Sequence, residues 1–232
     1  MTFAGPRESA DNGRNAVNAI ALVLLFAPFY LNDFASIYVH DWRAWLAIDY
    51  VFVKALPLLL VAWMMARRQV ARADLGLGVT RAGSALATLL LATGVGVLLD
   101  QNGYTAIAAL PGYPALGGMP EISVPAVNWI DLTLGLALVG LVEELVFRAM
   151  LADLLARCGA GATTTVAVSS LAFGFIHWSA GLHVVVVTTV IGAVFMFIYL
   201  RWRTLPALAL AHALVDFVDF AGVIPKSLFK VL

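Results

Sequence analysis

Two adjacent carboxylates and an arginine interrupt a long apolar run in the second half of the chain. They lie in the segment VEELVFR, residues 142–148. On a helix, Glu144 and Arg148 are four residues apart with the acid on the amino-terminal side, so they can form an ion pair. Glu143 points about 100° away from that pair and is left uncompensated. Because a charged side chain in a bilayer is costly unless it is paired or solvated, Glu143 is a candidate functional residue.

Two later pairs of residues repeat the four-residue spacing. Phe173 and His177 share one helix face, and His212 and Asp216 share another. Asp216 can accept a hydrogen bond from the imidazole of His212 and so fix its tautomer, although Asp219 lies on nearly the same face and is a competing partner. His177 also has a purely structural interpretation, as a histidine that is hydrogen-bonded at an interface or to a neighbouring helix.

The composition places these residues in a membrane. Of 232 residues, 62% are hydrophobic and only 12% are charged, which exceeds what a soluble domain of this size buries. The formal net charge is zero and gives no indication of nucleic-acid binding, so the expected surroundings are the lipid bilayer. The single cysteine, Cys158, excludes a disulfide framework within the chain and argues against a thiolate metal site.

The apolar runs predict an all-α fold, a polytopic transmembrane helix bundle of about seven spans with an intramembrane polar cavity. Each run has about the length that a bilayer crossing needs. The six tryptophans lie at or near the ends of these runs, where an interfacial aromatic belt is expected. The expected spans are Ala16–Ile37, Trp45–Ala66, Gly83–Leu99, Val127–Met150 with an extension to Arg157, Ala162–Trp178, Val184–Leu200 and Leu205–Phe220.

The same pattern divides the chain into four parts and orients it. Arginines gather in the second, fourth and sixth loops, which predicts that these loops and the amino terminus are cytoplasmic, with the carboxy terminus outside. Lys226 and Lys230 fit that last placement poorly. Residues 101–125, rich in glycine and proline, predict a long external loop that is either a lid over a cavity or a plain connector. The parts are a tail (1–15), amino-terminal helices with the external loop (16–126), a catalytic core (127–220) and a second tail (221–232).

Taken together, the three motifs resemble those of the CAAX prenyl protease and bacteriocin-processing family, also called CPBP or Abi intramembrane proteases. The resemblance covers roughly residues 130–220, and as a combination the motifs are specific. Two positions depart from the family pattern: Ala149 stands where glycine is usual, and Asp216 where asparagine is most frequent. The motifs are Glu143-Glu144-x-x-x-Arg148, Phe173-x-x-x-His177 and His212-x-x-x-Asp216.

The resemblance implies hydrolysis of a peptide bond in a water-filled intramembrane cavity of a bacterial cytoplasmic membrane. The substrate would be a membrane-embedded or lipid-modified protein or peptide of the CAAX type. Glu143, assisted by His177, would activate water, because a desolvated carboxylate is a stronger base. His212, oriented by Asp216, would stabilise the oxyanion or help to bind a metal. Glu144 would brace the site or touch it, with structural support from Arg148 and Phe173.

Three questions stay open at the level of the sequence. Glu143, His177 and His212 could hold a divalent metal such as zinc with an open position, or work without one. A non-proteolytic membrane regulator or bacteriocin-immunity protein could keep the same fold for binding alone. A proton- or ion-coupled transporter is a third hypothesis, because Lys54 and Asp49 place a further pair of opposite charges within the second expected span.

Overall fold

The computed structural model describes residues 8–107 and 111–224, and every regular element in that part of the chain is a helix. The all-α fold class predicted from the sequence is therefore confirmed. The elements are α1 (Glu8–Tyr38), α2 (Trp42–Ile48), η1 (Asp49–Ala55), α3 (Leu56–Ala66), α4 (Ala82–Ile107), α5 (Pro125–Ile130), η2 (Asp131–Gly135), α6 (Leu136–Glu143), η3 (Glu144–Met150), α7 (Leu151–Arg157), α8 (Ala162–Phe175), η4 (Trp178–Ala180), α9 (Leu182–Trp202) and α10 (Leu205–Phe220).

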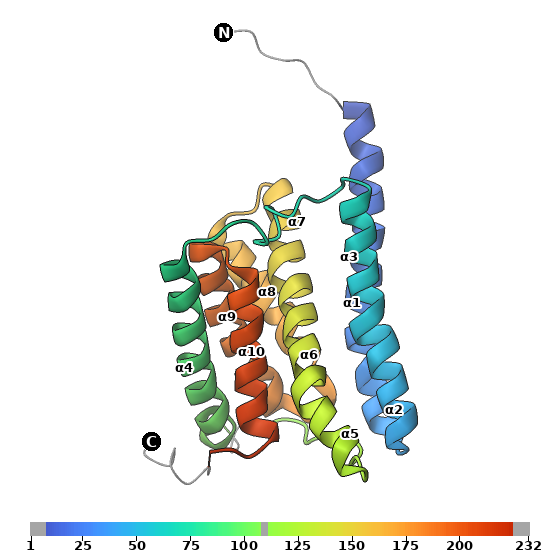
Figure 1. Ribbon diagram of the computed structural model, residues 1–232. Helices are drawn as coiled ribbons and strands as arrows, with labels where there is room; N and C mark the ends of the chain where they lie inside the picture. Colours follow the sequence, from blue (N-terminus) through green and yellow to red (C-terminus); the bar gives the residue numbers. More distant parts are fainter. Residues whose placement is uncertain (1–7, 108–110, 225–232) are drawn as a thin grey trace.

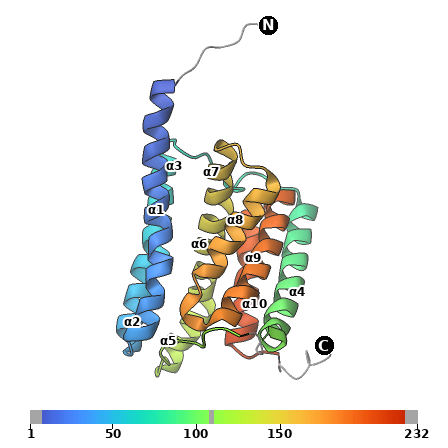
Figure 2. The same cartoon turned by 180° about the vertical axis from the view of Figure 1, so that it is seen from behind.

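The helices form two groups (Figures 1 and 2). In one group, α1 lies beside a continuous rod made of α2, η1 and α3. In the other, α10 packs between α4 and α6, and α9 packs against α4 and α8. Phe147 joins the groups, since its ring makes edge contacts with Phe26 and Phe29 of α1 at centroid distances of 5.0 and 5.2 Å. A third ring contact, to Phe173 at 5.8 Å, connects the same side chain to α8.

Three segments within the long rods are π-helical: η1, η2 and η3. In a π-helix the hydrogen-bond repeat is i to i+5 rather than i to i+4, so each turn holds more residues. Side chains that a regular helix would spread over different faces therefore come together. Each of the three segments begins at an acidic residue, namely Asp49, Asp131 and Glu144.

The approach of α6 to α10 depends on Gly140. A Cβ atom at this position would lie 2.6 Å from the carbonyl oxygen of Ala209 and 2.9 Å from the amide nitrogen of Ala213. Small residues at helix interfaces allow backbones to come this close in membrane proteins. Glycine thus sets the spacing between the helix that carries Glu143 and the helix that carries His212.

The number of predicted spans is revised. Among the described residues, three helices are long and apolar enough to cross a membrane: Trp42–Ala66, Ala82–Tyr104 and Leu182–Trp202. Val23–Tyr38 and Ala162–Phe175 are apolar but shorter, and α10 has 16 residues. The protein is a helical membrane bundle, but the expected seven spans are not reached by length and composition, because several helices are short or carry charges.

Two segment boundaries also differ from those expected. The first helix begins at Glu8 rather than at Ala16, and α4 continues to Ile107, so Gln101 belongs to a helix and not to a loop. The irregular segment begins after α4 and, over residues 111–124, bonds to its neighbours. Leu116 donates a backbone hydrogen bond to Ser179, and Gly118 donates one to Ser36. The expectations for residues 1–7 and for Lys226 and Lys230 lie outside the described residues.

Candidate active site

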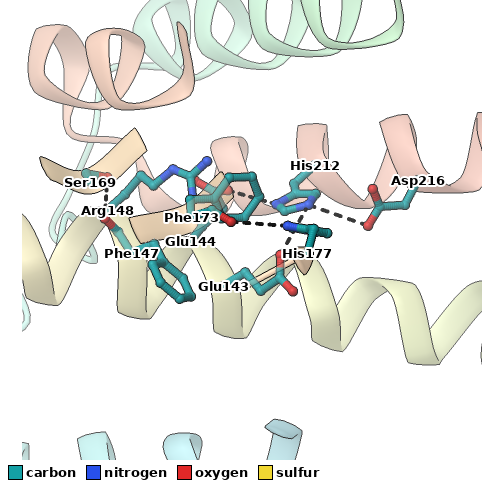
Figure 3. Close-up of polar contacts among 9 residues, drawn as sticks. All are labelled: Glu143, Glu144, Phe147, Arg148, Ser169, Phe173, His177, His212 and Asp216. Atoms are coloured by element: carbon teal, nitrogen blue, oxygen red, sulfur yellow. Dashed lines mark hydrogen bonds and ion pairs between the residues drawn. The ribbon is translucent and has the colours of Figure 1, made fainter. Parts of the chain in front are cut away.

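The site residues come from three helices that are distant in sequence (Figure 3). Glu143 ends α6 and Glu144 begins η3, while Arg148 follows one turn later in the same rod. Phe173 lies near the end of α8, with His177 just beyond it. The third contributor is α10, which carries His212 and Asp216. The structure thus brings together side chains that are up to about seventy residues apart in the chain.

His212 lies at the centre of this group. Its Nδ1 atom is 2.8 Å from Oε1 of Glu144, which is a hydrogen bond. On the other side of the ring, Nε2 is 3.6 Å from Oε2 of Glu143 and 3.5 Å from Oδ2 of Asp216. An ionised carboxylate can only accept, so the short contact to Glu144 places a proton on Nδ1. Glu144, and not Asp216 as expected, therefore makes the closest contact that orients the imidazole.

Both glutamates reach one histidine, although they are adjacent in the chain. In a regular helix, adjacent residues point about 100° apart, and this separation suggested that Glu143 and Glu144 have unrelated partners. Glu143 is the last residue of α6 and Glu144 the first of η3, so the pair lies at the junction of the two repeats. Their carboxylates approach opposite nitrogens of His212, Glu144 at Nδ1 and Glu143 at Nε2.

Glu144 also contacts Arg148, as the four-residue spacing predicted. The Oε2 atom lies 3.1 Å from Nε of Arg148, and both side chains are fully buried. The pair lacks hydrogen-bond geometry, so the attraction is mainly electrostatic. The guanidinium carbon also lies 3.9 Å from the centre of the Phe173 ring, a cation–π contact. Glu144 thus bridges a fixed positive charge and the imidazole of His212.

His177 is held by the backbone of its own helix. Its Nδ1 atom lies 3.1 Å from the carbonyl oxygen of Phe173, so Nδ1 donates and Nε2 is left as the acceptor. The Phe173 ring makes edge contacts with both histidines, at centroid distances of 5.2 Å to His177 and 5.8 Å to His212. Phe173 therefore contacts Arg148 and both imidazoles. From the sequence, only its contact with His177 was expected.

The choice between Asp216 and Asp219 as the partner of His212 favours Asp216. Asp219 instead accepts a hydrogen bond from Gln101 at 3.2 Å, and Gln101 also donates to Asp100 at 2.9 Å. Both α4 residues were missed: Gln101 was assigned to the external loop, and Asp100 lies between that loop and the expected span. The available signal was a pair of polar residues directly after a long apolar run.

Glu143, His177, His212 and Asp216 all face one cavity of about 490 Å³. Both helix groups supply its walls, and Gly117, Gly118 and Met119 of the irregular segment line it as well. Glu144 and Arg148 are behind this wall and do not line the cavity. Glu143, His177, His212 and Asp216 can therefore contact a substrate in the cavity. Glu144 and Arg148 cannot, and act only through their contacts with these residues.

A metal site was one of the open alternatives, with Glu143, His177 and His212 as candidate ligands. Within the described part of the chain, no group of three or more His, Cys, Asp or Glu side chains is placed to hold a metal ion. The residues as arranged do not fit a zinc site of the usual kind. The chemistry below is accordingly derived from the side chains themselves.

These features define an integral membrane protein of the helical-bundle class, with buried carboxylates and imidazoles at the wall of an internal cavity. Residues 125–218 match the family described as "Type II CAAX prenyl endopeptidase Rce1-like". The resemblance predicted from the motifs is thereby confirmed for the segment that carries all of them. At the level of the family, the match supports an intramembrane peptidase. No curated protein and no solved structure matches the chain.

Proposed function

We propose that the protein is an intramembrane endopeptidase that hydrolyses a peptide bond of a membrane-associated or lipid-modified protein of the CAAX type. The observation that carries the proposal is the position of Glu143, whose carboxylate faces the cavity with an oxygen 3.6 Å from Nε2 of His212. A carboxylate beside an imidazole, in a cavity of substrate size and within the segment that matches a peptidase family, supports acid–base hydrolysis.

In the proposed reaction, Glu143 removes a proton from water while the water oxygen attacks the scissile carbonyl carbon. His177, with Nε2 as an acceptor, helps to position this water. The proton taken by Glu143 then passes to the nitrogen of the leaving group as the carbon–nitrogen bond breaks. The products are a carboxylate and an amine, and Glu143 is regenerated.

His212 stabilises the negative oxygen of the tetrahedral intermediate. Glu144 accepts the hydrogen on Nδ1, so donation from Nε2 to the oxyanion requires an imidazole that carries both protons. The carboxylates of Glu143 and Asp216 on the Nε2 side compensate this charge. Asp216, which cannot donate when ionised, acts in this scheme by balancing and positioning His212 rather than by binding the oxyanion.

The test is cleavage of a lipid-modified C-terminal peptide by the purified protein in proteoliposomes. We expect Glu143→Gln to lower kcat by about 10³-fold, in the range observed for loss of a general base, and His212→Ala to lower it by a similar factor. Glu121→Gln is the control, because Glu121 is exposed in the irregular segment away from the site. Cleavage by Glu143→Gln and His212→Ala at the rate of the control would exclude this mechanism, and no cleavage by the wild-type protein would favour a non-catalytic role for the fold.

A further inference from the structure

A second buried polar centre, which the proposed reaction does not use, lies in the rod formed by α2, η1 and α3. Lys54 and Asp49 form a buried ion pair. The ammonium nitrogen of Lys54 also lies 4.2 Å from the centre of the Tyr50 ring, and the Tyr50 hydroxyl donates a hydrogen bond of 2.9 Å to Asp131. Two π-helical segments therefore meet here, η1 through Tyr50 and η2 through Asp131.

The π-helix is what pairs Lys54 with Asp49. Residues five apart in an α-helix point about 140° away from each other. In the wider turn of a π-helix, residues five apart come much closer to one face. A local departure from α-helical geometry thus gathers a cation, a carboxylate and an aromatic ring at one level, and such departures are frequent at functional sites.

This centre faces the same cavity as Glu143 and His212. Asp49, Lys54 and Asp131 all line it. Among the described residues that line the cavity, Lys54 is the sole lysine or arginine, whereas seven are aspartate or glutamate. An anionic group of a bound substrate is repelled by most of this wall and attracted at one place, next to Lys54.

Lys54 has hydrogen-bonding capacity for such a group. Its ammonium carries three N–H donors, and the hydrogen bond recorded for it goes to Asp49. The Tyr50 ring stabilises the cation through its face without using a donor. The side chain is held in place on two sides and still has donors available to a ligand in the cavity.

We propose that Lys54 binds the free α-carboxylate at the C-terminus of the substrate. This inference rests on the proposed peptidase function and adds a determinant of specificity to it. The carboxylate would form a charge-assisted hydrogen bond with the ammonium, of the kind that is shorter and stronger than neutral ones. A peptide that is amidated or extended at its C-terminus cannot make this contact at the same place.

The levels of the two centres along the helices also define a length. Tyr50 and Asp131 lie at about the same level because they are hydrogen-bonded, and the two rods run in the same direction from there (Figure 1). Lys54 is four residues further along one rod and Glu143 twelve residues further along the other. At about 1.5 Å per residue, their levels differ by about 12 Å. The axial part of the separation between the two centres is thus similar to the span of about 10 Å that an extended chain of three residues has.

Binding measurements test this proposal separately from catalysis. The probe is a fluorescent, lipid-modified peptide with three residues after the modified one, prepared with a C-terminal carboxylate or a carboxamide. Its affinity is measured by anisotropy for the full chain in nanodiscs. We expect the wild-type protein to bind the carboxylate form about tenfold more tightly than the amide. Lys54→Met should reduce this ratio to about one, and Lys54→Arg should retain most of it.

Two further variants keep the outcome interpretable. Because Lys54→Met leaves Asp49 buried without its cation, the double variant Asp49→Asn with Lys54→Met removes both charges and should also give a ratio of about one. Arg157→Met is the matched control, because Arg157 is a partly exposed cation paired with Asp153 outside the cavity, and it should leave the ratio unchanged.

Two results would overturn the proposal: equal affinity of the wild-type protein for both peptides, or a preference for the carboxylate that survives in Lys54→Met and in the double variant. Neither result depends on hydrolysis. Conversely, a protein that prefers the carboxylate but cleaves neither peptide would contradict the proposed reaction at Glu143 and leave the assignment of Lys54 supported.

Discussion

Two buried ion pairs in the described part of the chain, each of an acid with a lysine or arginine, resemble each other in composition and differ in where their charges lie. Glu144 with Arg148 and Asp49 with Lys54 each occupy a π-helical segment that begins at the acid. The cation of each pair lies over an aromatic ring, Phe173 in one case and Tyr50 in the other. Only the second pair lines the cavity, whereas Glu144 and Arg148 are fully enclosed by protein.

Because of this difference, we expect Arg148 and Lys54 to have different roles. Arg148 does not line the cavity, so in the proposed reaction its charge acts through Glu144 on the orientation of His212. Lys54 faces the space that a substrate would occupy and can act on it directly. The first pair belongs to the segment that matches a peptidase family, and the second lies outside residues 125–218. Hence the second pair is where this chain can have a specificity of its own.

The largest difference should appear in stability when each cation is removed. Arg148→Met leaves Glu144 charged and fully enclosed, and loss of one partner of a buried pair costs about 3–5 kcal/mol. Lys54→Met leaves Asp49 buried but at the cavity wall rather than fully enclosed, and should cost less, about 1–3 kcal/mol. Reversible unfolding in mixed micelles, followed by circular dichroism, measures both. Equal losses would mean that the two environments do not differ as described.

The next effect concerns the orientation of His212. Glu144→Gln keeps an oxygen that can accept from Nδ1, but it removes the charge that faces Arg148. Loss of the hydrogen-bond partner that orients a metal-bound histidine costs about 10–100-fold, and by analogy we expect kcat to fall by about that factor with KM within about twofold. Steady-state cleavage in proteoliposomes gives both constants.

A matched substitution at the second pair separates positioning from a general loss of folding. Asp49→Asn changes a buried acid to its amide in the same way, but at the centre to which we assign binding. It should alter KM for carboxylate-terminated peptides more than kcat. The same pattern in both variants would show that the two pairs do not have separate roles.

The aromatic rings over Arg148 allow a smaller test. Phe173 lies 3.9 Å from the guanidinium and Phe195 lies 5.8 Å away, and both rings are buried. The Phe173 ring also contacts Phe147 and both imidazoles, whereas Phe195 contacts His212. The difference between Phe173→Leu and Phe195→Leu therefore gives an upper bound on the cation–π contribution. We expect Phe173→Leu to be the more destabilising by about 1–2 kcal/mol in unfolding experiments. Phe195→Leu serves as the control, and equal values would exclude a cation–π contribution.

The sequence predicted the parts of the site that depend on spacing within one helix. Glu144 with Arg148, and His212 with Asp216, were expected from their i, i+4 positions and are neighbours in the structure. The contact of Glu144 with His212 was not expected, because it joins helices that are far apart in the chain. Such contacts leave no local pattern that a single sequence displays.

The π-helical segments explain most of the remaining differences. Nothing in the residue types around Asp49 or Glu144 distinguishes a π-helix from an α-helix, yet the change of repeat decides which side chains share a face. From the sequence, Lys54 could either snorkel or pair with Asp49, and the structure has the pair, at a spacing of five residues that an α-helix does not bring onto one face. Gln101 was assigned to a loop because of the glycines and prolines that follow it, although α4 continues past it.

The smallest expected effect concerns the hydrogen bond between Tyr50 and Asp131, which joins the helix that carries Lys54 to the helix that carries Glu143. Tyr50→Phe removes the hydrogen bond to Asp131 but keeps the ring beneath Lys54. It should cost about 0.5–1.5 kcal/mol of stability, the usual value of one such hydrogen bond. Tyr30→Phe is the matched control, because Tyr30 also donates between helices, to the carbonyl of Ala172 at 2.8 Å, but lies away from Lys54.

If the Tyr50 to Asp131 contact fixes the distance between Lys54 and Glu143, the two variants should differ in where they cut. Mass spectrometry of the products should show cleavage at more than one bond for Tyr50→Phe and at a single bond for Tyr30→Phe. A single, unchanged bond in both variants would mean that the level of Lys54 is set by the packing of the rods as a whole. The preference for a carboxylate should persist in either case, since the ammonium and the ring that supports it remain.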